Sequence, residues 1–111
     1  MSRIKNLTPH SIVVRLPDGG ERKFEPTGTI PRVGTIEILA DPIEGIPTVT
    51  QTMGTVEGLL EPQEGVFLLV SAMVFNASDR TDLIAPDTGK GAIRDDQGRI
   101  LAVTRFIRKG V

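Results

Sequence analysis

The stretch "EGVFLLVSAMVFNASD", residues 64–79, decides the fold. Its first part, residues 66–70, is continuously apolar and predicts a strand that is buried on both faces. After Ser71 the residues are poor strand formers, and helical spacing is followed by Leu69, Val70, Met73, Val74 and Ala77. We therefore expect a strand ending near Val70 and a short helix over residues 71–78, with Ser71 as its N-cap. One long strand is the alternative that periodicity leaves open.

Turn residues occur at short intervals on both sides of this stretch, which is typical of short antiparallel strands. "SIVVRL" (residues 11–16) predicts a strand with Ile12, Val14 and Leu16 on one face, and "PDGG" turns it into "ERKFE" (residues 21–25). Near the C-terminus, "GAIRD" (residues 91–95) and "RILAVTRFI" (residues 99–107) predict a second hairpin around Gly98.

Two further strands are expected in the middle of the chain. "GTIEILA" (residues 34–40) alternates, so that Ile36, Ile38 and Ala40 share a face, and "PTVTQTM" (residues 47–53) is rich in β-branched residues. The predicted fold class is therefore mostly β (α+β), with a compact antiparallel β-sheet core and one or two short helices.

Composition limits the range of functions. The 111 residues predict a single β-rich domain spanning positions 1–111. The net charge of -1 argues against a general DNA or RNA binder, although a local arginine cluster could still hold a small anion. The chain has no cysteine, and its longest apolar run is too short to cross a bilayer, so we expect a cytoplasmic protein without a membrane partner.

Few residues could support catalysis. His10 is the only histidine, and its turn-rich surroundings favour a structural role over that of a general base. Asp79, Asp82 and Asp87 could build a Mg²⁺-dependent phosphodiesterase, but aspartates near turns more simply accept backbone hydrogen bonds. We predict no catalytic residue, no metal site, no cofactor and no enzymatic activity.

Arginines give the stronger signal. Guanidinium groups bind phosphate through paired hydrogen bonds, and the candidates for such contacts are Arg32, Arg80, Arg94 and Arg105. Phe75 could cover a base while Asn76 contacts its polar edge. The alternatives are surface ion pairs such as Arg80 with Asp82 for the arginines, and a place in the core for Phe75.

Four segments in the same order resemble a family of small phage and prophage proteins: "NLTPHSIVV", "PTGTIPRV", "GLLEPQEGVFLLVSAMV" and "RTDLIAPDTGKGAIRDDQGRILAVTRF". The chain departs from that pattern at Thr81, where a second aspartate is expected beside Asp82. The family is similar to the anti-Thoeris sponge proteins of phages. Asp82 and Thr88, at motif positions, complete the candidate ligand-binding set.

The resemblance implies a function and an assembly. Such sponges bind cyclic ADP-ribose isomers made by bacterial TIR immune enzymes, and some also bind the cyclic oligonucleotides of CBASS immunity. They bind without cutting, are β-rich, and assemble as hexamers built from dimers. The expected function is therefore sequestration of cyclic nucleotide signals in the cytoplasm of an infected bacterium. The alternative is a phage structural or assembly accessory protein without a small-molecule ligand.

Overall fold

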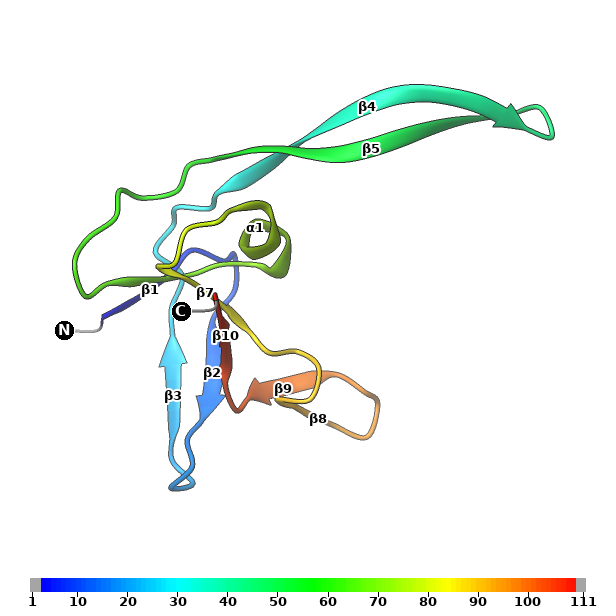
Figure 1. The fold of residues 1–111 in the computed structure, drawn as a ribbon. Helices are drawn as coiled ribbons and strands as arrows, with labels where there is room; N and C mark the ends of the chain where they lie inside the picture. Colours follow the sequence, from blue (N-terminus) through cyan, green and yellow to red (C-terminus); the bar gives the residue numbers. More distant parts are fainter. Residues whose placement is uncertain (1–2, 110–111) are drawn as a thin grey trace.

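The computed structural model describes residues 3–109, which form short strands, one long hairpin and a short helix (Figure 1). In chain order the elements are β1 (Ile4–Asn6), β2 (Ile12–Arg15), β3 (Glu21–Phe24), β4 (Arg32–Ile43), β5 (Ile46–Glu57), β6 (Phe67–Leu69), α1 (Ala72–Ala77), β7 (Leu83–Pro86), β8 (Ala92–Arg94), β9 (Ile100–Val103) and β10 (Phe106–Arg108). The predicted mostly β, α+β class is confirmed. Within the described range, no helix has the length and apolarity needed to cross a membrane.

The first sheet is built around the apolar run that begins at Val66. Its strand order is β1-β6-β7-β10, with β1 and β7 parallel to the central β6 and β10 antiparallel to β7. Helix α1 follows β6 closely, and the hydroxyl of Ser71 accepts a hydrogen bond from the N–H of Val74 at 3.3 Å. The predicted strand, helix and N-cap are all confirmed.

The second sheet joins two hairpins in the order β3-β2-β9-β8. Both hairpins, β2-β3 and β8-β9, were predicted from the sequence and are confirmed. Gly98 has φ 80° in the β8-β9 turn, a conformation that glycine adopts without steric cost. A parallel pairing between Val14 and Val103 connects the two hairpins.

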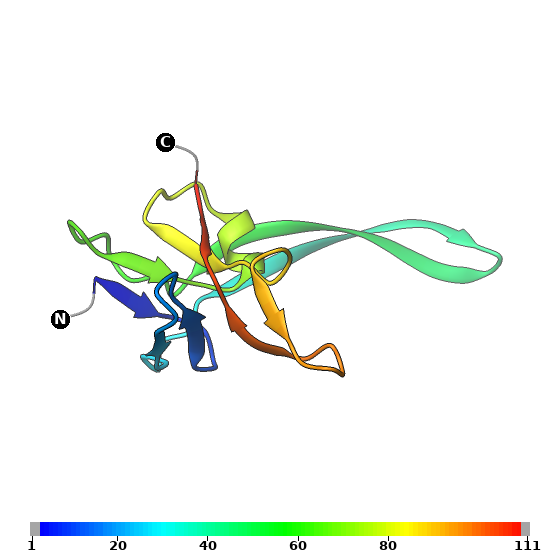
Figure 2. The ribbon, with the colours of Figure 1, turned by 90° about the horizontal axis from the view of Figure 1, so that it is seen from below.

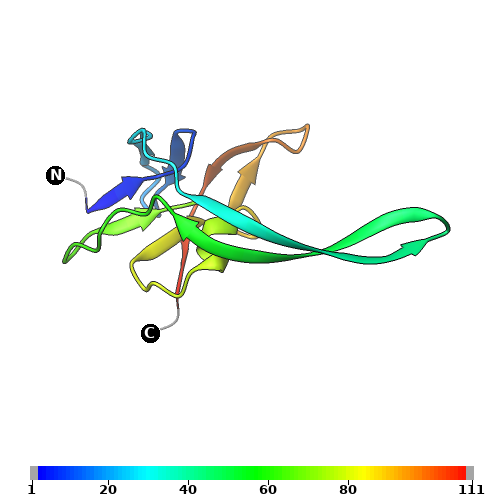
Figure 3. The same ribbon diagram turned by 90° about the horizontal axis from the view of Figure 1, so that it is seen from above.

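The first sheet lies between two apolar layers. On the side of α1, the buried cluster contains Leu68, Val74, Phe75, Leu83 and Ala85. On the side of the second sheet, the buried cluster contains Val14, Phe24, Leu69, Ile84 and Val103. Figures 2 and 3 show α1 beside the start of the β4-β5 hairpin, whose Val33 and Val56 pack against the first cluster.

Strands β4 and β5 form a long hairpin, residues 32–57, which we call the arm. It projects from the rest of the chain, which we call the body (Figures 1 and 3). The radius of gyration is 17.0 Å, against roughly 13 Å for a compact domain of this length. The chain therefore departs from the expected compact core, because its two longest strands lie mostly outside that core.

Two details of the predicted sheets are wrong. Pairing is mixed, because β1-β6, β6-β7 and β2-β9 are parallel. The segment expected as one strand, residues 99–107, is divided into β9 and β10. The break occurs because Thr104 N–H binds the carbonyl of Gly91, while the carbonyl of Arg105 accepts from Asp87 N–H, so the chain passes from the second sheet to the first.

Candidate functional site

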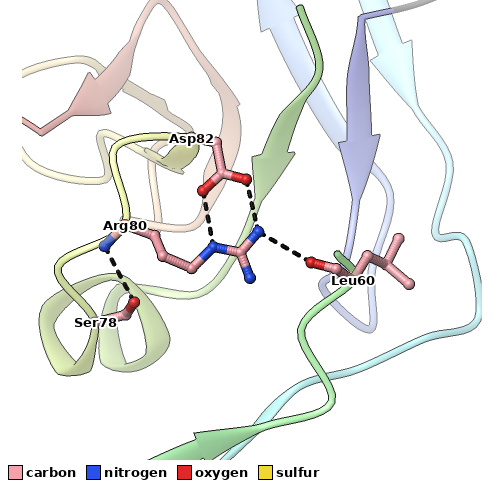
Figure 4. A network of polar contacts seen from close by, with 4 residues as sticks. All are labelled: Leu60, Ser78, Arg80 and Asp82. Carbon is pink, nitrogen blue, oxygen red and sulfur yellow. Dashed lines mark hydrogen bonds and ion pairs between the residues drawn. The ribbon is translucent and has the colours of Figure 1, made fainter. Parts of the chain in front are cut away.

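Arg80, in the loop after α1, is held in one orientation by its neighbours (Figure 4). Its Nε and Nη2 donate to the two carboxylate oxygens of Asp82 at 3.0 and 2.6 Å, and Nη2 also donates to the Leu60 carbonyl at 2.9 Å. The Ser78 hydroxyl accepts from the Arg80 backbone N–H. Figure 4 shows the remaining guanidinium nitrogen, Nη1, pointing away from Asp82 without a partner among the residues drawn. The Arg80–Asp82 ion pair, which the sequence offered as an alternative, is thus present. Among the residues drawn, Nη1 of Arg80 has no hydrogen-bond partner.

Arg80 lines an open hollow of about 550 Å³ between the arm and the end of α1. One wall is the arm base with the turn that follows it, including Gly54, Val56 and Leu59, and the other is the loop from Ala77 to Arg80. A side chain at Gly54 would come within 3.1 Å of the Gly34 carbonyl, so glycine lets the two arm strands approach closely here.

Of the other predicted residues near this hollow, two are exposed to solvent and one is buried. Asn76 is exposed on α1, and Arg32 is exposed at the start of β4, in register with Glu57. Phe75 is buried in the core, where Lys109 lies 4.0 Å from the centre of its ring and donates to its carbonyl. Phe75 therefore anchors helix α1 in the core, and neither face of its ring is open to the solvent.

The remaining predicted residues surround the loop between β7 and β8. Arg105 Nε donates to Asp87 Oδ2 at 2.6 Å. Arg94 donates to the carbonyls of Thr88 and Gly98 at 2.9 and 2.6 Å, so it is held by neutral groups. Thr88, Arg94 and Arg105 are thus brought together, with the exposed Lys90 beside them, and this cluster carries more positive than negative charge.

Asp87 organises this second cluster. The hydrogen bond from Arg105, helped by the N–H of Gly89, holds the pKa of the Asp87 carboxyl below its ordinary value. Gly91 packs so tightly here that an added Cβ would lie 2.9 Å from the Cβ of Asp87 and 3.0 Å from the Cγ of Arg105. The backbone at Gly91 is therefore packed tightly against the side chains of Asp87 and Arg105.

The eight predicted residues form two groups. Arg80, Asp82, Phe75, Asn76 and Arg32 belong to α1, its following loop and the arm base, whereas Thr88, Arg94 and Arg105 belong to the β8-β9 end. Figure 1 shows these two regions well separated, with α1 beside the arm and the β8-β9 hairpin away from it. The eight predicted residues therefore do not gather into one site on the described chain.

The carboxylates considered for a metal site are occupied in other ways. Asp82 pairs with Arg80 and Asp87 with Arg105, while Asp79 is exposed at the rim of the hollow. Across residues 3–109, no three acidic or histidine side chains gather closely enough to hold a metal ion.

Asn6 is an important structural residue outside the candidate site: the sequence indicates a turn at Asn6, Thr8 and Pro9, but not the burial of Asn6. It is buried, its amide donates to the carbonyls of His10 and Phe24 at 2.8 Å each, and its Oδ1 accepts from the N–H of Thr8 at 2.9 Å. His10 enters this network through its backbone carbonyl, and its side chain is exposed. The "NLTPH" segment therefore fixes a turn, and the residue types Asn6, Thr8 and Pro9 are the signal for that turn in the sequence.

Comparison of the chain with protein-family models, with curated proteins and with solved structures finds no match. The similarity to phage sponge proteins thus remains a prediction from the sequence motifs.

Proposed function

We propose that this protein is a non-catalytic binding protein that sequesters a cyclic nucleotide signal, in the manner of the phage sponges that its sequence resembles. The observation that carries the proposal is the arrangement of Arg80, which is held by Asp82 and Leu60 at the rim of an open hollow with Nη1 left over. A guanidinium that is already oriented loses little conformational freedom when it binds phosphate.

Charge determines how such a site would have to be completed. Asp82 balances the charge of Arg80, and Asp79 lies at the same hollow, so this group alone offers a phosphate little net attraction. The cluster of Thr88, Arg94 and Arg105 has the excess positive charge that the hollow lacks. We therefore place the ligand between two copies, with the hollow of one and the cationic cluster of the other around it.

The test is capture and release. Purified protein is incubated with a cyclic ADP-ribose isomer, separated from free ligand by filtration, and then denatured by heat. Release of intact ligand supports sequestration, whereas a cleaved product would refute the proposal in favour of an enzyme. Absence of retention with this isomer and with a panel of cyclic di- and trinucleotides would also refute it.

Variants locate the site. Arg94→Ala and Arg80→Ala are each expected to weaken capture about tenfold or more, since a hydrogen bond to a charged group contributes roughly 1.5–3 kcal/mol. Arg15→Ala is the matched control, because Arg15 pairs with Glu21 on the exposed β2-β3 hairpin. Unchanged capture by both site variants would remove these arginines from the site.

The second candidate function is that of a phage structural or assembly accessory protein. The exposed apolar surface of the arm supports this candidate. Its large apolar side chains are exposed along most of its length, Leu39 to 84%. Exposed apolar surface of this kind marks an interaction with another macromolecule. Failure to retain any cyclic nucleotide would support this candidate, whereas self-association is expected for both functions.

A further inference from the structure

The outer part of the arm is an apolar surface that no other segment of residues 3–109 covers. In the β4-β5 register, Ile36, Ile38 and Ala40 lie opposite Thr52, Thr50 and Thr48, so one face of the arm carries no charge. At the tip, Ile43 pairs with Ile46, and their exposures are 64% and 61%. Figures 1 and 3 show this part projecting beyond the body. Monomeric proteins rarely leave so much apolar surface in water.

The tip also carries negative charge at a conformational cost. Glu44 has φ 50° and Gly45 has φ 79°, which is the pattern of a two-residue hairpin turn with both central residues at positive φ. Asparagine or glycine normally takes the first of these positions, because other side chains are strained there. Over residues 35–53 the arm has the acidic residues Glu37, Asp41 and Glu44 and no lysine or arginine. Two arms laid side by side would therefore repel each other.

The body has a surface of the complementary kind. A hollow of about 190 Å³ lies on the face of the first sheet that carries the second buried cluster, and it is lined by Ile4, Phe67, Ile84, Phe106 and Arg108, which come from all four strands of that sheet. The guanidinium carbons of Arg3 and Arg108 lie 5.7 and 4.8 Å from the centre of the Phe67 ring.

Arg3 donates from Nε to the carbonyl of Gly65 at 2.8 Å, while its terminal guanidinium nitrogens and those of Arg108 remain available to a negative group. Within residues 3–109, neither arginine forms a salt bridge with a carboxylate. Asp82 lies in the adjoining hollow that Arg108 also lines, but it is paired with Arg80. This surface is therefore an apolar floor with two cations beside it, and we call it the arginine-phenylalanine face.

We propose that the arm tip of a second copy of this chain binds the arginine-phenylalanine face. The side chains of Ile43 and Ile46 enter the apolar hollow, and the carboxylate of Glu44 lies against Arg3 and Arg108. Both complementary surfaces are on the same chain, so two copies can exchange arms reciprocally and close a dimer. The proposal does not depend on the bound ligand and holds for either function considered above.

A charge exchange tests the pairing, with dissociation constants of the full chain measured by sedimentation equilibrium. Glu44→Lys and Arg108→Glu are each expected to raise the dissociation constant about tenfold or more, and the double variant to restore most of the affinity. Lys23→Glu, on the exposed β3 strand, makes the same charge change elsewhere and should leave association unchanged. Circular dichroism checks that each variant is folded, and Arg3→Glu replaces Arg108→Glu if the latter is not.

A second variant separates the carboxylate from the turn. Glu44→Asn suits the positive φ better, so at a dilution where both chains are monomeric it should leave the thermal midpoint equal or higher, while at higher concentration it weakens association. A wild-type chain that stays monomeric at about 100 µM would overturn the proposal. So would an arginine variant that associates like the wild type, a double variant without recovery, or tighter association of Glu44→Lys, which would indicate pairing of arm with arm.

Discussion

Replacement of Asn6 by alanine should destabilise the fold strongly, although Asn6 lies near one end of the chain. The side chain is almost fully buried and makes three hydrogen bonds, to His10, Phe24 and Thr8. The Thr8 hydroxyl lies 2.6 Å from Asn6 Oδ1 and 2.9 Å from the His10 carbonyl, and its single proton can serve only one of them at a time. With about 0.5–1.5 kcal/mol for each of the three bonds, the expected loss is about 1.5–4.5 kcal/mol. Thr8 N–H is left without an acceptor, which favours the upper half of that range.

Urea unfolding measures this loss. The chain has no tryptophan or tyrosine, so far-ultraviolet circular dichroism is the suitable signal. With a slope of about 1–3 kcal/mol per molar urea, a loss of about 3 kcal/mol moves the midpoint by roughly 1–3 M. Wild type and variant are compared at one protein concentration, because self-association adds to apparent stability. Ser11→Ala is the control, since within residues 3–109 its hydroxyl donates to the exposed Glu25 and to no other group. A loss below about 0.5 kcal/mol for Asn6→Ala would refute the view that this network holds the turn.

Three further outcomes are expected. Gly91→Ala should lower stability by about 1–3 kcal/mol in the same urea assay, because its Cβ would collide with Asp87 and Arg105. The pKa of Asp87 is lowered in the folded state, so this carboxylate stabilises the fold above its ordinary pKa of 3.8, and that contribution disappears as the pH falls through the lower folded value. Thermal midpoints measured from neutral to acidic pH should accordingly fall less steeply at the acid end for Asp87→Asn than for the wild type. Leu69→Ala should cost about 2–5 kcal/mol while the exposed Leu101→Ala costs almost nothing, and equal effects in urea would contradict the assignment of the core.

Sequence patterns were sufficient for the local elements. The apolar run and Ser71 predicted β6 and α1, and turn residues predicted the β2-β3 and β8-β9 hairpins. Parallel pairings could not be read in this way, because the register of β1 with β6 depends on contacts between residues far apart in sequence. The division at Arg105 follows from backbone bonds to the β7-β8 loop, which also have no local signal.

The sequence indicates which residue types a candidate site would use, but not how those residues are arranged in space. From the sequence, an ion pair of Arg80 with Asp82 was the alternative to phosphate binding by Arg80, and the structure has this ion pair. The pairing of Arg105 with Asp87 spans two strands and was not foreseen. The alternation of Ile36 and Ile38 was predicted correctly, yet nothing in the sequence distinguished a hairpin that leaves the body from one that packs on it.

The parallel pairings have a consequence for the order of folding. The first sheet needs β10, which pairs with β7, and the second needs the parallel contact of Val14 with Val103, so neither sheet is complete until residues 103–108 have been synthesised. The arm, in contrast, pairs only neighbouring segments and can form early. During synthesis the arm, residues 32–57, therefore emerges before the surface proposed to receive it exists, because that surface includes Phe106 and Arg108. Neighbouring nascent chains on one messenger RNA would then be exposed to premature association, and acidic residues along the hairpin would oppose it.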